Sequence, residues 1–308
     1  MSRFFCCCGG RRRGGEDASK VNNHSSAESD LRSENGESVS SKQNGASELG
    51  ADARKSGVRG PKPAKGANQG AVLVEMFTSQ GCTSCPPADA LISRLGRGEG
   101  DDVKLENPIP LVILAFHVEY WDYLGWKDPF ASSAWTLKQR AYGQALEQDR
   151  IYTPEVVVQG RSHCIASNAS SIVSLIQSAD RFPAPDVQAV FSRPSPLFLQ
   201  ISLSVSLKFK VEGYTLDAML AIYENGLVTD CNKGENKGKL LTNDYVVRGL
   251  HKACSFQDWP AKKMSRGEVT FQLWDGFVKS KCGVAVFLQN PETMEVYGAQ
   301  QLELPNDI

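Results

Sequence analysis

Two cysteines separated by two residues, Cys82 and Cys85, are the pair in this sequence best suited to chemistry. Such a dithiol can be oxidised to a disulfide or can ligate a metal ion. The apolar run 71–77 before the pair predicts a buried strand, and Pro86 and Pro87 after it are typical of a first helical turn. Because unpaired amides at a helix start stabilise a thiolate, the pattern favours a redox dithiol. Cys82 would be the nucleophile and Cys85 the resolving thiol.

A metal site and a purely structural pair are the alternatives for this dithiol. His117 follows a second predicted buried strand, so it would reach the same sheet edge and complete a copper or zinc site with Cys82 and Cys85. The preferred interpretation of His117 is a hydrogen-bonded structural histidine. Structural roles are also preferred for His163 and Cys164. No cofactor is predicted.

A threonine–proline pair, Thr153-Pro154, lies between a predicted helix and a predicted strand. It resembles the cis-proline of thioredoxin-like proteins, which packs against their C-x-x-C motif. A cis bond is tolerated essentially only before proline. Thr153 and Pro154 are therefore predicted to join Cys82 and Cys85 in the site, against the alternative of an ordinary trans turn. The aromatic-rich loop 120–130 is expected to form either a rim that binds a ligand or a packed lid over the domain.

The surrounding elements predict two domains after a tail. Residues 70–182 give the order strand, helix, strand, helix, strand, strand, helix, which resembles the thioredoxin core. A proline-rich linker is predicted at 183–196, and strict alternation of apolar residues predicts an all-β antiparallel sandwich at 197–304. The expected fold class is thus an α/β thioredoxin-like domain followed by an all-β sandwich. Residues 1–69 lack the apolar content for a core and are predicted to be disordered.

Charge and cysteine usage indicate where the chain acts. With 34 basic and 35 acidic residues in 308, nothing favours nucleic-acid binding. The nine cysteines form no small-domain disulfide framework, and the N-terminus does not read as a signal peptide, so a cytoplasmic location is expected and secretion is not. Cys6, Cys7 and Cys8 before a run of arginines suggest S-acylation and peripheral membrane attachment. The alternatives are an unmodified terminus and part of a targeting peptide.

Several longer motifs resemble the DUF1223 family, a thioredoxin-like family of uncharacterised function. The resemblance spans about 70–304 and is carried by the following segments: 77–89, 117–122, 125–130, 152–154, 234–239 and 245–248. It implies the fold more than the activity. Gly-Glu-Asn-Lys-Gly-Lys at 234–239 is interpreted as a solvated turn, the alternatives being an anion site or a contact with the first domain.

The function expected from these residues is thiol–disulfide exchange at Cys82 and Cys85, with a protein or a small molecule as the thiol or disulfide substrate. Two other functions stay open. One is copper or zinc handling through Cys82, Cys85 and His117, and the other is a non-catalytic interaction module in which the dithiol is a structural relic.

Overall fold

The computed structural model describes residues 60–63, 65, 69–306 and 308, all within one structural unit, Lys55–Ile308. The predicted disordered tail, 1–69, lies almost wholly outside the described residues, and so do Cys6, Cys7 and Cys8. Within the described part of the chain, no helix combines the length and the apolar character that a membrane span requires.

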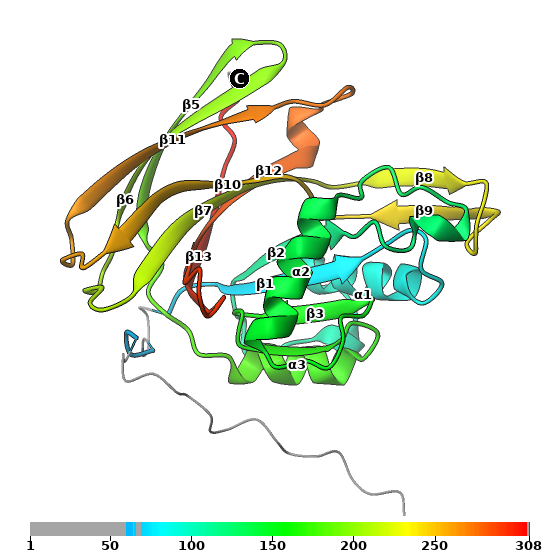
Figure 1. The fold of residues 1–308 in the computed structure, drawn as a ribbon, viewed down its shortest axis with the longest axis horizontal. Helices are drawn as coiled ribbons and strands as arrows, with labels where there is room; N and C mark the ends of the chain where they lie inside the picture. Colours follow the sequence, from blue (N-terminus) through cyan, green and yellow to red (C-terminus); the bar gives the residue numbers. More distant parts are fainter. Residues whose placement is uncertain (1–59, 64, 66–68, 307) are drawn as a thin grey trace, which may run out of the picture. The chain divides into compact units, whose positions relative to one another are not determined.

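One mixed sheet of eight strands runs through both halves of the sequence (Figure 1). In spatial order the strands are β13 (Val296–Leu302), β12 (Cys282–Gln289), β7 (Thr215–Glu224), β10 (Val246–Gln257), β2 (Leu111–His117), β1 (Val72–Thr78), β3 (Glu155–Val158) and β4 (Ser162–Ile165). The halves join where β10 runs parallel to β2, with Val246 opposite Ala115. The amide of Ala115 donates to the carbonyl of Tyr245 at 2.7 Å.

This shared sheet shows that the predicted fold class, an α/β thioredoxin-like domain followed by a separate all-β sandwich, is wrong. Strands predominate, and strands from both halves belong to one sheet. The physical reason is the edge of β2 that β1 leaves unpaired, because buried backbone N–H and C=O groups require partners and β10 supplies them. Strand β5 (Asp186–Ser195) also occupies most of 183–196, the range predicted as a linker.

Three helices pack on the β1–β4 part of the sheet (Figure 1). Helices α1 (Cys85–Arg97) and α3 (Ala169–Ser178) share one apolar cluster with alternate residues of β1, while α2 (Ser133–Ala145) packs on the opposite face. The run 72–78 is apolar nearly throughout because both of its faces are covered. Under α2, the cluster containing Phe77 continues into Phe287 of β12, so one core serves both halves.

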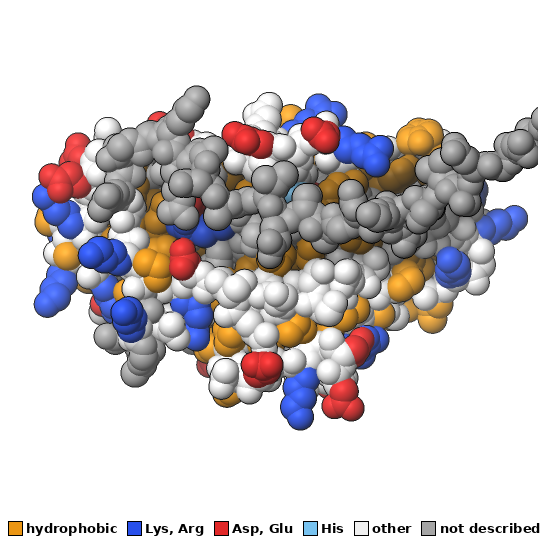
Figure 2. Space-filling view, turned by 90° about the horizontal axis from the view of Figure 1, so that it is seen from below, with side chains coloured by type: hydrophobic (Ala, Val, Ile, Leu, Met, Phe, Trp, Pro, Cys, Tyr) orange, Lys and Arg blue, Asp and Glu red, His pale blue; other side chains and the backbone are white. Residues whose placement is uncertain are grey.

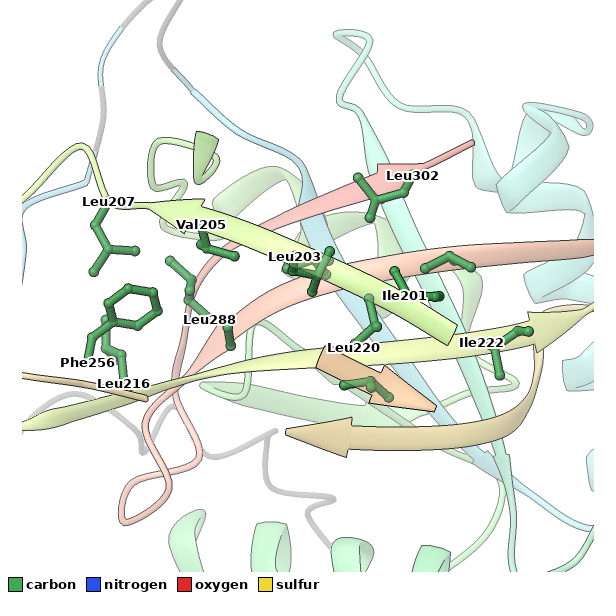
Figure 3. Close-up of a cluster of buried hydrophobic side chains, with 14 of the residues drawn as sticks. Ile201, Leu203, Val205, Leu207, Leu216, Leu220, Ile222, Phe256, Leu288 and Leu302 are labelled. Carbon is green, nitrogen blue, oxygen red and sulfur yellow. The ribbon is translucent and has the colours of Figure 1, made fainter. Parts of the chain in front are cut away.

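A second layer covers the other end of the large sheet. It contains three antiparallel strands in the order β11 (Met264–Gln272), β6 (Phe198–Ser206) and β5. The alternating apolar residues of β6 are buried and face side chains of β7, β10 and β12 (Figure 3). Alternation in 199–205 therefore predicted this strand correctly.

The remaining elements are short. A two-stranded hairpin, β8 (Leu227–Cys231) and β9 (Lys239–Asn243), lies with β9 beside α1 (Figure 1). Three 3₁₀ turns complete the described structure: η2 (Asp101–Val103), η3 (Asp122–Leu124) and η4 (Lys279–Lys281). On the face in Figure 2, basic and acidic side chains are interspersed over the coloured surface, so this face gives no concentrated field of one sign.

Candidate functional site

The two motif cysteines lie at the junction of β1 and α1. After Thr78 the chain turns, with the amide of Cys82 donating to the carbonyl of Ser79 at 3.1 Å, and Cys85 is the first residue of the helix. Pro86 and Pro87 fit the first turn because amides there have no intrahelical acceptor. The dithiol thus lies at the positive end of the helix dipole, as predicted from the sequence.

The two thiols are free and are held in different protonation states. The thiol of Cys85 donates to Cys82, and this bond outweighs burial, so that the pKa of Cys82 falls to about 5. Ser84 assists, since its Oγ lies 3.3 Å from the sulfur of Cys82. Burial, followed by the thiolate beside it, raises the pKa of Cys85. The pair therefore rests as one thiolate and one thiol at neutral pH.

The peptide bond between Thr153 and Pro154 is cis, which confirms that prediction. The structure brings this bond to the dithiol: the carbonyl oxygen of Thr153 is 3.8 Å from the sulfur of Cys82. Trp121 Nε1 donates to the hydroxyl oxygen of Thr153 at 2.7 Å. That bond leaves the hydroxyl hydrogen free to donate to Cys82, which helps to lower its pKa.

Behind the thiols lies a buried set of acids around His117. Nδ1 of His117 is 2.7 Å from a carboxylate oxygen of Asp128, and both side chains are fully buried. Burial opposes the charge on each, but their mutual attraction prevails, so the pKa of His117 is raised and that of Asp128 is lowered. Burial raises the pKa of Asp89, on α1, to about 7, although the charge of His117 opposes the shift. Asp89 contributes to the raised pKa of Cys85.

This arrangement bears on the metal alternative. His117 is the hydrogen-bonded histidine that was preferred from the sequence, and its partner is Asp128. Among the residues that the structure describes, no three His, Cys, Asp or Glu side chains are grouped to hold a metal ion. His163 is likewise occupied: its Nδ1 lies 3.0 Å from the hydroxyl of Tyr152. The geometry supports thiol chemistry better than metal ligation.

The loop between β8 and β9 contacts the dithiol segment directly. Asn236 is fully buried and its Nδ2 donates to the carbonyls of Gln80 and Cys82, each at 2.9 Å. Gln80 Nε2 in turn donates to Asn243 at 2.8 Å. Residues 234–239 do include a turn with mostly exposed residues, but Asn236 is not solvated: its amide satisfies backbone carbonyls that the turn at Cys82 leaves open, in accord with the alternative of a contact with the first domain.

A close approach of backbone explains one glycine of this loop. Gly234 has a φ of +69°, and a Cβ atom there would lie 2.9 Å from that of Trp126. Trp126 also contacts the segment before Cys82, since its Nε1 donates to Gln80 Oε1 at 3.1 Å. Part of the loop 120–130 is thus a packed seam, in accord with one of the two expectations for it.

The other part of the aromatic loop lines a pocket of about 260 Å³ over the thiol of Cys82. Its walls are Cys82, Thr83, Ser84, Trp121, Leu124, Thr153 and Glu235. Cys82 is 4% exposed, through this opening, whereas Cys85 is 0% exposed. The sulfur of Cys82 can therefore contact a ligand, whereas the sulfur of Cys85 is buried.

Sequence reasoning placed Cys82, Cys85, Thr153 and Pro154 together, and the structure does bring the cis bond to the thiols. Sequence reasoning missed the contributions of five residues: Gln80, Asp89, Asp128, Glu235 and Asn236. All five lie within the motifs that carried the family resemblance, and this was the available signal.

The comparisons with known proteins agree with the motifs. The family model described as a protein of unknown function (DUF1223) matches residues 73–289. The crystal structure of protein AGR_C_4864 from Agrobacterium tumefaciens is similar, with 25% identity and a TM-score of 0.52 over 80% of this chain and 98% of that one. HBP35 of Porphyromonas gingivalis shares the fold at 16% identity, with a TM-score of 0.53 over 79% of each chain. A comparison with curated proteins found no match. The match to the family model covers well over half of the sequence, so the chain belongs to the DUF1223 family.

Proposed function

We propose that this protein is a thiol–disulfide oxidoreductase in which Cys82 attacks the substrate and Cys85 resolves the intermediate. The observation that supports this best is the thiolate of Cys82, with a pKa lowered to about 5 by the Cys85 thiol, at the bottom of an open pocket. A structural cysteine pair needs neither a lowered pKa nor an opening to solvent. A site built for exchange needs both.

The reaction proceeds in two exchanges. The Cys82 thiolate attacks one sulfur of a substrate disulfide, a Cys82–substrate disulfide forms, the substrate S–S bond breaks, and the first half leaves as a thiolate. Cys85 then loses its proton and attacks Cys82 Sγ, and the second half leaves as a thiolate. The proton from Cys85 is finally bound by one of the two thiolate products. The substrate disulfide gains two electrons, and the Cys82–Cys85 dithiol becomes a disulfide.

The pH dependence of alkylation tests the thiolate. Iodoacetamide should modify Cys82 with a midpoint near pH 5, and the rate should fall below that pH as the thiolate gains its proton. At pH 5.5, a much larger fraction of Cys82 than of an ordinary cysteine is thiolate, but each thiolate is intrinsically less nucleophilic. The net alkylation rate of Cys82 should therefore be roughly twentyfold higher than that of an ordinary cysteine. Cys164 and Cys282, with pKa values raised by burial to about 11 and about 12, serve as internal controls in peptide mapping. A midpoint above pH 8 would overturn the proposed function.

Asp89 is predicted to accept the proton of Cys85 in the second exchange. Its pKa of about 7 means that the carboxylate form grows as the pH rises through 7, so the second exchange should accelerate over the same range. Asp89→Asn should slow that step roughly 10- to 100-fold and remove the inflection near pH 7, while leaving the first exchange unchanged. Stopped-flow release of each thiol product separates the steps. Asp101→Asn, at an exposed carboxyl, is the control, and equal rates in both variants would exclude the role.

A further inference from the structure

Access to Cys82 is restricted by walls that are held in place. Trp121 is fixed to Thr153 through its indole nitrogen at 2.7 Å, on one side of the opening. On the other side, the buried Asn236 ties the β8–β9 loop to the carbonyl of Cys82 itself. Gly81 leaves no spare room either, since a Cβ there would lie 3.0 Å from Trp121. The opening cannot widen without breaking these contacts.

The size of this opening selects the substrate. A disulfide within a protein joins two backbone segments whose Cα atoms are about 5.5 Å apart. A nucleophile can contact its sulfur atoms only if both backbone segments fit around the nucleophile. The pocket above Cys82 holds about 260 Å³, just below the range of small-molecule sites, which begins near about 300 Å³. It accommodates one half of a small disulfide with the other half directed to solvent. A folded protein would need Cys82 to protrude, and this residue is 4% exposed.

The charge of the pocket walls further restricts the class of substrate that fits. Apart from the Cys82 thiolate itself, Glu235 is the only charged residue among those that line the pocket in the described structure. The remaining walls are hydroxyl-bearing or apolar, and they include the ring of Trp121, which can attract a cation through its π face. Lys233 and Lys237 flank Glu235 in the sequence but do not line the pocket. A bound ligand therefore meets the carboxylate of Glu235 beside the sulfur.

From this geometry we propose, on the basis of the proposed function, that the substrate is a low-molecular-weight disulfide carrying a cationic amine. The amine lies between Glu235 and Trp121 while one sulfur meets Cys82. The exchange then follows the two steps given above: Cys82 displaces one half as a thiolate, and Cys85 displaces the amine-bearing half from Cys82. Glu235 acts as a specificity residue and takes no part in bond making.

Three probes of similar size and different charge test this proposal on the full chain in its reduced form. Cystamine is cationic, 2-hydroxyethyl disulfide is neutral and dithiodiglycolate is anionic. Each single-turnover rate is divided by the rate of the same probe with a free small thiol, which removes intrinsic reactivity. The expected order is cystamine, then 2-hydroxyethyl disulfide, then dithiodiglycolate. Insulin, as a protein disulfide, should react more slowly than all three.

Glu235→Gln should lower the cystamine rate about two- to fivefold, raise the dithiodiglycolate rate and leave the neutral probe unchanged, the range expected for an exposed ion pair. Glu212→Gln is the matched control, because it makes the same change in net charge at an exposed residue outside the pocket. Equal effects of the two variants, or insulin reacting as fast as 2-hydroxyethyl disulfide, would overturn this inference while leaving the proposed function intact. If none of the probes reacts at Cys82, the proposed function itself fails.

Discussion

The Cys85→Ser variant is expected to stop after the first exchange, with half of the substrate disulfide attached to Cys82. A serine hydroxyl cannot displace a thiolate from sulfur, but it can still donate a hydrogen bond to Cys82, so the first exchange should keep its low-pH reactivity. With 2-hydroxyethyl disulfide, wild-type protein should release two thiols per chain and the variant one. Intact-mass measurement should show the adduct, and peptide mapping should place it on Cys82.

Cys82→Ser supplies the opposite result and completes this experiment. It removes the thiolate and leaves Cys85, whose pKa is raised by burial and which is fully buried, so adduct formation at pH 5.5 should fall to the background of the other cysteines. Cys164→Ser is the control, because this thiol also has a raised pKa and does not line the Cys82 pocket. Release of two thiols by Cys85→Ser, or an adduct of equal yield in Cys82→Ser, would assign the chemistry to other residues.

The sequence was informative where chemistry depends on neighbours along the chain. A run that is apolar nearly throughout, followed by Cys82, Cys85 and two prolines, specifies a buried strand and the start of a helix by local rules alone. The position of Thr153-Pro154 was also accessible, since few peptide bonds other than X-Pro adopt the cis form. These features place the nucleophile, its resolving thiol and one wall of the pocket.

Local sequence rules did not predict which strands pair along the edges of the sheet, or which groups bond to buried side-chain amides. Alternation predicts that 199–205 forms a strand, but it does not say which edge a strand of the range 197–304 will join. Pairing of Val246 with Ala115 turned two expected domains into one sheet. Asn236 reads as a loop residue because Asn and Gly favour turns, and its burial depends on carbonyls about 150 residues away. Long-range contacts of this kind carry no local signal.

The shared core makes a second large effect predictable, at Lys138 of α2. Its ammonium group lies 3.1 Å from a carboxylate oxygen of Glu75, which is fully buried in the centre of β1. The alignment is that of an ion pair rather than of a directed hydrogen bond, since this oxygen has no bond of good geometry. Glu75 also accepts from the hydroxyl of Tyr142, and Gln289 of β12 donates to that hydroxyl at 2.8 Å. The ammonium lies 5.5 Å from the ring centroid of Phe287 as well.

Lys138→Met should therefore lower the free energy of unfolding by about 3–5 kcal/mol, because it leaves the buried carboxylate of Glu75 without a counter-charge. The double variant Glu75→Gln/Lys138→Met should recover much of this loss, since a neutral amide and a methionine of similar length remove both charges together. Urea denaturation of the wild type, of Glu75→Gln, of Lys138→Met and of the double variant gives four free energies of unfolding, and the double-mutant cycle gives the coupling between the two residues.

Lys208→Met is the matched control for this experiment. Lys208 pairs with Asp186 at 3.2 Å, but its side chain is 46% exposed, so its replacement should cost less than about 1 kcal/mol. Since the Lys138 network links α2 and β1 to β12, its loss should also weaken the joint between the two halves of the sheet. Unfolding should then remain a single transition at lower urea, because one core connects both parts. If Lys138→Met costs no more than Lys208→Met, the ion pair contributes nothing to that joint, which then rests on the β10–β2 pairing and on the apolar cluster around Phe77 and Phe287.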